Sequence, residues 1–246
     1  MARFFLPRNQ IHDRRGVLDG PELDHLRRVL RLKPGDRITV FDEMGWEHEA
    51  VIRSLAAARG EIEILSSIHA QRESPLRITL AVGLTKGDKL DFVVEKATEL
   101  GVHSIIPFAS SHTVPKLDEK KIAARRSRWE KIALSAAKQC GRTAVPEVLP
   151  LWTFAELIAR PWPEAVKLLF WEKEADQSLL RVREKHGDLG AILVLTGPEG
   201  GFSAEEAELA RGHGFELVRL GGRILRAETA ALTALSLVQF LWGDLS

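Results

Sequence analysis

The sequence has few of the features that mark exported, membrane-spanning or metal-holding proteins. Its 246 residues include one cysteine, Cys140, so an internal disulfide cannot form, and no group of Cys and His has the spacing of zinc ligands. No apolar run reaches the roughly eighteen residues of a membrane span, and the opening segment MARFFLPRNQ lacks the apolar stretch and cleavage site of a secretory signal. These absences predict a soluble protein of the reducing cytoplasm that holds no structural metal.

A large net charge is also missing, although the charges are unevenly distributed. The chain carries 35 Lys and Arg against 34 Asp and Glu, for a formal net charge of +1. Residues 116–142 alone hold nine Lys and Arg against three acidic residues. Such a local excess indicates an anionic partner at one surface or a solvated helix face, and the charges by themselves favour the helix face.

The N-terminal third is predicted to be a small β-rich domain. Residues 37–65 have turn residues at Gly45 and Gly60 between short apolar stretches, which is typical of strands. A helical segment is predicted before them, over residues 21–32. Residues 67–75 are polar, lack a clear period and end in a proline, so we interpret them as a linker. A chain of this length, 45% hydrophobic, is long enough for two domains.

From residue 76 onward the pattern changes to strands that alternate with helices. Five strands are predicted, over 76–83, 103–108, 166–171, 191–196 and 215–220, and several of them are nearly continuous apolar runs. Such runs are expected where helices cover both faces of a parallel sheet. Helical spacing of apolar residues predicts helices over 88–101 and 128–141. The sequence therefore predicts an α/β domain with a mostly parallel sheet, without giving the strand order.

A last helix is predicted over residues 228–242 and is apolar around most of its circumference. Between Ala230 and Trp242 its only polar residues are Thr233, Ser236 and Gln239. A helix of this kind should be covered on two sides. One cover is its own sheet, and the other is a second subunit or, equally well, the interior of a monomer.

A glycine-rich loop lies within AILVLTGPEGGFSAEE, residues 191–206, at the carboxyl end of a predicted strand, where open α/β sheets bind ligands. Ser203 and Glu206 have the spacing of a capping box, which predicts a helix that begins just after Ser203. The loop matches neither the dinucleotide nor the triphosphate glycine motif, and it carries Glu199. A ligand with a positive centre is therefore a better fit than a pyrophosphate, and a tight turn without a ligand is equally compatible.

A second strand, glycine-rich turn and helix follow in LGGRILRAETAALTAL, residues 220–235. Arg223 and Arg226 lie in the turn, and Glu228 and Thr229 open the helix. Two such turns after neighbouring strands would converge on one pocket.

These two segments make the chain resemble a known family, the bacterial 16S ribosomal RNA uridine-N3 methyltransferases of the SPOUT class. The resemblance rests on LTGPEGGFSAEE and LGGRILRAETAA, and it continues in LTKGDKLDFVVEKATELGV, IIPF, AAKQCGR and the N-terminal HLRRVLRLKPGD. It covers essentially the whole chain, and the two C-terminal motifs together are highly specific. Lys138 departs from the pattern because it stands in AAKQCGR where an acidic residue is expected, so we assign that side chain no role.

The resemblance implies a fold and a partner for each part of the chain. Residues 75–246 would form a SPOUT methyltransferase domain, an α/β fold with a trefoil knot that binds S-adenosyl-L-methionine and pairs as a homodimer. Residues 1–70 would form a PUA-like, RNA-binding barrel. The substrate would be 16S ribosomal RNA within the small ribosomal subunit, and neither a membrane nor a metal is implied.

Carried over position by position, the two motifs imply the walls of the cofactor site. One wall consists of Leu195, Thr196, Gly197, Glu199, Gly200 and Gly201. The other consists of Leu220, Gly221, Ile224, Leu225, Arg226, Thr229 and Ala230. Backbone groups would read the adenine edge, with apolar side chains on its faces. Phe170 and Trp171 are further candidates, although aromatic residues at a strand end are more often core.

Methylation of uracil N3 requires alignment of the acceptor and removal of its proton. Arg226 and Arg142 are candidates for stabilising negative charge on the uracil oxygens, and Glu199 is a weaker candidate for the base. For each arginine, a phosphate contact or surface ion pair is an equally good interpretation. The basic residues predicted to follow the RNA backbone are Arg8, Arg27, Arg28, Arg31, Lys86, Arg125, Arg126 and Arg142.

Two other functions stay open from the sequence. A SPOUT-type enzyme that methylates the ribose 2′-oxygen of RNA would carry the same motifs. A ribosome-assembly protein that binds RNA without catalysis would keep the PUA-like domain, but the intact glycines of the 197–201 loop argue against it.

Overall fold

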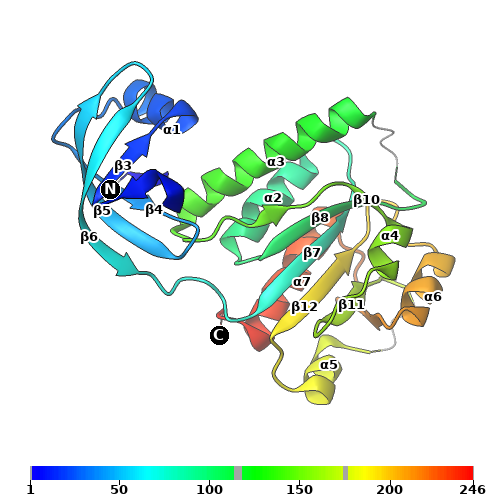
Figure 1. The fold of residues 1–246 in the computed structure, drawn as a ribbon. Helices are drawn as coiled ribbons and strands as arrows, with labels where there is room; N and C mark the ends of the chain where they lie inside the picture. The colour runs from blue at the N-terminus through cyan, green and yellow to red at the C-terminus, as the bar shows by residue number, and fades with distance from the viewer. Residues whose placement is uncertain (1, 114–117, 174–176, 246) are drawn as a thin grey trace. The chain divides into compact units, whose positions relative to one another are not determined.

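The computed structural model describes residues 2–113, 118–173 and 177–245 (Figure 1). Lys116, the first basic residue of the charged 116–142 window, lies outside these ranges. No helix in the described ranges is both long enough and apolar enough to cross a membrane.

The chain forms two compact units. The first consists of Met1–Glu73 together with Ala137–Val145, and the second of Ser74–Ala136 and Pro146–Ser246. The sequence assigned the 137–145 segment to the second domain, whereas its contacts group it with the first. Ion pairing is one reason, since Nζ of Lys138 lies 2.8 Å from a carboxylate oxygen of Glu22.

A mixed six-stranded sheet forms the first unit. Its strands are β1 (Arg3–Phe5), β2 (Ile11–His12), β3 (Arg15–Leu18), β4 (Arg37–Phe41), β5 (Trp46–Leu55) and β6 (Gly60–His69). They lie in the order β1-β4-β5-β6-β3-β2, with β1 and β4 parallel and the other neighbours antiparallel. Phe4, Ile38, Val40 and Ile52 are among the buried side chains of its core. The strands predicted over 37–65 are confirmed.

The helix predicted over residues 21–32 is present but ends earlier. A 3-10 turn, η1 (Arg8–Gln10), precedes it; α1 (Gly20–Asp24) then runs directly into a π-helical turn, η2 (His25–Val29). The chain leaves helical geometry because Arg31 has a left-handed backbone, with φ 53°, and because Pro34 disfavours helical geometry at the residue before it. The predicted linker also begins later than residue 67, since β6 continues to His69.

A parallel sheet forms the centre of the second unit. Its strands are β7 (Arg77–Gly83), β8 (Ser104–Ala109), β9 (Glu147–Val148), β10 (Trp152–Thr153), β11 (Val166–Phe170), β12 (Ala191–Thr196) and β13 (Glu216–Val218). The order is β10-β8-β7-β12-β11-β13, with β9 also beside β8, and every pair is parallel. All five predicted strands and the parallel arrangement are confirmed. The sequence missed β9 and β10, which are too short to produce an apolar run.

Helices lie on both faces of this sheet (Figure 1). They are α2 (Lys89–Glu99), α3 (Glu119–Cys140), α4 (Phe154–Ala159), α5 (Leu179–His186), α6 (Ala204–Gly212) and α7 (Ala227–Trp242). Buried residues of α4 and α6 share one core with alternate residues of the central strands, including Leu193 and Leu195. Helix α7 contacts β7, β12 and α2. Helices therefore cover both faces of the apolar strands, as predicted.

The predicted last helix is confirmed as α7, but it is not covered all round. Ala231, Ala234, Leu235 and Val238 are fully buried. The exposed fraction is 57% for Phe240, on the opposite side of the helix. The trefoil knot remains a prediction from the resemblance.

Candidate functional site

A cavity of about 380 Å³ opens at the carboxyl ends of three strands of the second unit. Most of its lining comes from residues 170–172 after β11, 196–202 after β12, and 219–227 between β13 and α7. Because β11 lies between β12 and β13, the two glycine-rich turns border the same space. This is the edge at which open α/β sheets bind ligands.

The turn after β12 is fixed by close approach of one backbone to another. A Cβ on Gly83, the last residue of β7, would lie 2.3 Å from the nitrogen of Pro198, so only glycine fits there. Gly201 has φ +65°, and its N–H donates to the carbonyl of Pro198 at 2.9 Å. The Ser203 hydroxyl accepts from the N–H of Glu206 at 3.1 Å, and the Glu206 carboxylate accepts from the N–H of Ser203 at 3.0 Å. The predicted capping box and the start of α6 are confirmed.

The turn after β13 leaves its backbone groups free. Across the described ranges, residues 220–225 make no hydrogen bond to another backbone group. Gly221 has φ +84°, a conformation that side-chain-bearing residues rarely adopt. Backbone N–H and C=O groups normally find partners when they are shielded from water. Residues 221–224 are instead exposed to solvent, so their backbone groups are available to a bound molecule.

Two side chains in the cavity wall carry buried polar atoms that lack a partner among the described residues. They are Nε1 of Trp171 and Oγ1 of Thr196, in side chains with exposed fractions of 5% and 1%. A buried polar group left unpaired costs about 1–3 kcal/mol. A ligand that pairs with the indole N–H and the hydroxyl would remove that cost, so these atoms indicate a site for a polar molecule.

Glu199 projects from the first turn but is already held by two donors. Its Oε1 accepts from the backbone N–H of Lys86 at 3.0 Å and from Nζ of Lys89 at 2.9 Å. Partial burial raises the pKa of the Glu199 carboxyl, but these donors outweigh burial and the net pKa is lowered. The carboxylate therefore ties the turn to the segment that leads into α2, and it is a poor proton acceptor.

A second carboxylate, Glu172, lines the same cavity without a partner among the described residues. It lies against the glycine-rich turn, since a Cβ on Gly201 would be 2.9 Å from Oε1 of Glu172. The cavity thus contains one carboxylate held by lysine and one free to meet a ligand.

Family comparisons agree with this geometry. Residues 72–239 match the model of the RNA methyltransferase domain, and residues 18–65 match that of the RNA methyltransferase PUA domain. The chain belongs to this family of RNA methyltransferases. The resemblance found in its motifs is thereby confirmed, as is an α/β methyltransferase domain joined to a PUA-like domain.

Curated relatives of this methyltransferase carry the name Ribosomal RNA small subunit methyltransferase E. The protein of Bacillus subtilis (strain 168) is 33% identical over 247 residues, which cover 98% of this chain and 96% of the relative. The protein of Synechocystis is 35% identical over 241 residues, which cover 97% of this chain and 77% of the relative.

Solved structures of similar chains extend the comparison to the whole fold. A Ribosomal RNA small subunit methyltransferase E from Neisseria gonorrhoeae, bound to S-adenosyl methionine, is 39% identical, with a TM-score of 0.88 and coverage of 100% of both chains. A Legionella pneumophila protein, solved with the bound cofactor SAM, is 33% identical with a TM-score of 0.91 and coverage of 99% and 98%.

Eleven of the thirteen residues predicted for the cofactor site line the cavity. The two exceptions are Leu195, which is fully buried in the core beneath, and Thr229, which is exposed on α7. Phe170 and Trp171, named as further candidates, line it too. The lining residues that the sequence missed are Lys89, Glu172, Pro198, Phe202, Arg219, Arg223 and Ala227. Arg219 directly follows β13, and Glu172 and Pro198 come two residues after the ends of β11 and β12; that position was the available signal.

The two candidate catalytic arginines lie in different units. Arg226 lines the cavity. Arg142 belongs to the first unit, where it is 6% exposed and its Nη2 lies 2.6 Å from the Glu73 carboxylate. That ion pair favours a structural role for Arg142, because its guanidinium is buried and would lose the compensating charge of Glu73 if the two were separated.

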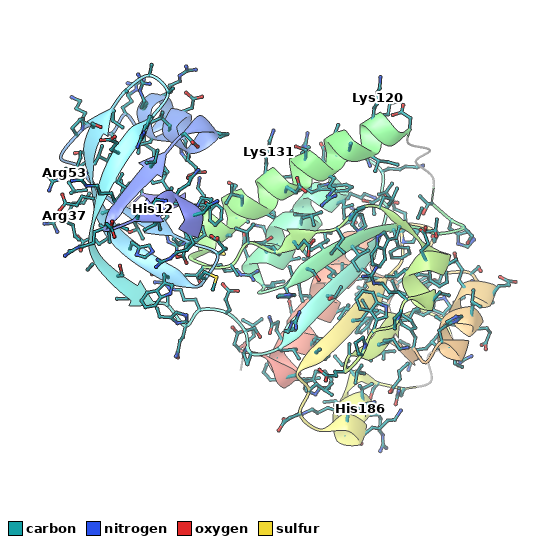
Figure 2. All side chains as sticks on the ribbon, viewed as in Figure 1. His12, Arg37, Arg53, Lys120, Lys131 and His186 are labelled. Atoms are coloured by element: carbon teal, nitrogen blue, oxygen red, sulfur yellow. The ribbon has the colours of Figure 1, made fainter. Side chains whose placement is uncertain are left out.

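The residues predicted to follow RNA fall into two groups. Five have protein partners: Arg8 with Asp42, Arg27 with the carbonyls of Ala56 and Ala57, Arg28 with Asp24, Arg126 with Glu130 and the Val148 carbonyl, and Arg142 with Glu73. Within the described ranges the side chains of Arg31, Lys86 and Arg125 have none. On α3, Lys120 and Lys131 project away from the helix (Figure 2), and both are exposed. RNA contacts at all these positions stay predictions.

Proposed function

We propose that this protein transfers the methyl group of S-adenosylmethionine to N3 of one uridine in 16S ribosomal RNA. The observation that carries the proposal is the cavity between the two glycine-rich turns. Its volume of about 380 Å³ lies in the usual range for small-molecule sites. The relatives named for small-subunit ribosomal RNA, and the similar structures solved with the cofactor, support the substrate and the cofactor.

The lining of the cavity suits S-adenosylmethionine. The free backbone groups of residues 220–225 would read the adenine edge, and Leu220 and Leu225 would pack on its faces. Trp171 and Thr196 would each gain the hydrogen-bond partner that they lack. Bound there, the cofactor supplies a methyl group on a positively charged sulfur, and its transfer leaves a neutral thioether. Glu172 places an unpaired negative charge in the same cavity.

Uracil N3 must lose its proton before the electron pair of the N3–H bond can form a bond to the methyl carbon. Glu199, the candidate base from the sequence, has a lowered pKa and is held by Lys86 and Lys89. We therefore propose that the unpaired carboxylate of Glu172 accepts the N3 proton. The N–H electron pair stays on N3, and Arg226 offsets the charge that develops on the uracil oxygens.

The acceptor atom can be tested with purified protein, S-adenosylmethionine and small-subunit particles. A methyl group on N3 blocks Watson–Crick pairing, so we expect reverse transcriptase to stall at a single uridine. We expect no new alkali-resistant linkage, because the ribose 2′-hydroxyl is left free. An alkali-resistant linkage without a stall would assign the methyl group to the ribose. No methylation of the particles would contradict the proposal as a whole.

We further propose that the protein acts in the cytoplasm as a homodimer. Phe92 of α2, Leu237 and Phe240 of α7 and Leu245 have exposed fractions of 47%, 39%, 57% and 48%. Helices α2 and α7 contact each other, and we propose that these exposed side chains belong to one apolar surface. Exposed apolar surfaces of this kind mark interaction sites, and a second copy would cover this one symmetrically.

A further inference from the structure

The turn between β13 and α7 has an unusual set of charges. Its sequence from residue 219 to 226, RLGGRILR, contains three arginines and no acidic residue. Arg219, Arg223 and Arg226 are exposed and line the cavity. Within the described ranges, none of their side chains forms an ion pair or hydrogen bond.

Several arginines elsewhere in the same unit have acidic partners. Arg181 pairs with Glu184 at 3.0 Å, Arg183 with Asp188 at 2.7 Å, and Arg128 with Asp91 at 2.5 Å. The whole chain has almost as many acids as bases, so acidic partners are plentiful. Three unpaired guanidinium groups on one short turn repel one another, and an anion placed among them would relieve that repulsion. The turn therefore has the charge of an anion-binding surface.

An exposed apolar side chain lies within the same turn. Ile224, between Arg223 and Arg226, has an exposed fraction of 85%. A surface that combines guanidinium groups with an apolar side chain suits a nucleotide, because the guanidinium groups pair with phosphate and the apolar group packs on a base or ribose. A free inorganic anion would make no use of Ile224.

We infer that Arg219 and Arg223 bind the phosphates of the RNA strand beside the target uridine. This inference rests on the proposed function, because it names the surface that receives its RNA substrate. Each guanidinium presents a planar fork of donors that matches a phosphate. By pairing with phosphates of the RNA backbone, the two residues hold the strand at the mouth of the cavity, while Arg226 contacts the uracil. They are positioning residues that add to the basic positions predicted from the sequence.

The cofactor offers the competing anion, the carboxylate of its methionine part. That group carries one negative charge, whereas the turn presents three unpaired arginines. The exposure of all three also favours a partner that arrives from solvent and covers the turn. RNA supplies a phosphate at every nucleotide and meets both conditions.

The test compares the double variant Arg219→Gln/Arg223→Gln with the wild type and with Arg181→Gln, a matched exposed arginine on α5. Affinity for 16S RNA would be measured by filter binding over a range of salt concentrations, cofactor affinity by titration calorimetry, and KM and kcat by methyl-transfer kinetics. We expect the double variant to raise KM for RNA at least tenfold with little change in kcat. The slope of log Kd against log salt should fall by about 0.7 for each arginine removed. Arg181→Gln should match the wild type in KM for RNA and in the salt slope.

A second variant, Arg219→Lys/Arg223→Lys, keeps the charges and should keep most of the salt slope. The inference is overturned if the Gln variant retains the RNA affinity and salt slope of a wild type that methylates RNA. It is also overturned if the Gln variant loses cofactor affinity but not RNA affinity, which would assign the arginines to the cofactor carboxylate. A wild type that transfers no methyl group to RNA would contradict the proposed function itself.

Discussion

Two carboxylates line one cavity, and their partners decide which of them can accept a proton. Glu199 is held by the N–H of Lys86 and the ammonium of Lys89, and its pKa is lowered. Glu172 has no partner in the described part of the chain. A carboxylate stabilised in its ionised form by donors binds a proton weakly, so its driving force for removing the N3 proton is small.

The first prediction at this scale concerns the substitutions Glu172→Gln and Glu199→Gln. General-base catalysis contributes about 10²–10⁴-fold to rate, so Glu172→Gln should lower kcat by an amount in that range while RNA binding persists. Raising the pH should restore part of its rate, because uracil N3 ionises by itself in alkaline solution. Glu199→Gln should lower kcat less, since Glu199 positions the turn. Single-turnover rates of both variants at several pH values would measure these effects. If Glu199→Gln has the larger defect and Glu172→Gln does not recover in alkaline solution, Glu199 rather than Glu172 is the base.

At the scale of elements, the start of α7 closes one side of the cavity. Ala230 lines the cavity from the first turns of the helix, whereas the adjacent Thr229 is exposed outside the lining. Two neighbouring positions therefore differ in whether a larger side chain would enter the ligand space. Gly200 is a less suitable probe, because an added Cβ would lie 2.7 Å from Cβ of His112 and would displace the turn itself.

We predict that Ala230→Leu weakens S-adenosylmethionine binding and that Thr229→Leu does not. Extra methyl groups in a packed site cost about 1–3 kcal/mol, or about 5- to 150-fold in Kd. Titration calorimetry on both variants measures the difference, and thermal unfolding checks that each is folded. Equal affinities of the two variants would show that the cofactor does not occupy this part of the cavity.

At the scale of the whole molecule, the exposed apolar side chains of α2 and α7 lead to a prediction about assembly. The wild type should sediment as a dimer at micromolar concentration. Phe240→Glu should give a monomer, because a carboxylate buried in an apolar interface has no compensating partner. Leu180→Glu is the matched control, since Leu180 is equally apolar, has an exposed fraction of 63% and lies on α5. A monomeric wild type, or dissociation in both variants, would contradict the assignment of the interface.

Local sequence determined much of this protein. In the second unit, apolar runs such as 191–196 predicted the five longer strands, because a strand buried on both faces needs apolar residues in succession. The capping box of Ser203 and Glu206 gave the start of α6, since its hydrogen bonds span only three residues. The two glycine-rich motifs gave most of the cavity lining, because their backbone geometry depends on glycine at fixed positions.

Tertiary structure alone decided the features that depend on residues far apart in the chain. It paired Lys89 with Glu199 and Arg142 with Glu73, contacts that span 110 and 69 residues. These contacts are the reason that we propose Glu172 in place of Glu199 as the base and a structural role for Arg142. Tertiary structure also put the 137–145 segment into the first unit. Charge and burial depend on what surrounds a side chain in space, whereas periodicity records only its neighbours along the chain. Only the structure therefore shows that, among the described residues, Glu172, Arg219 and Arg223 lack partners while other charged residues of the unit are paired.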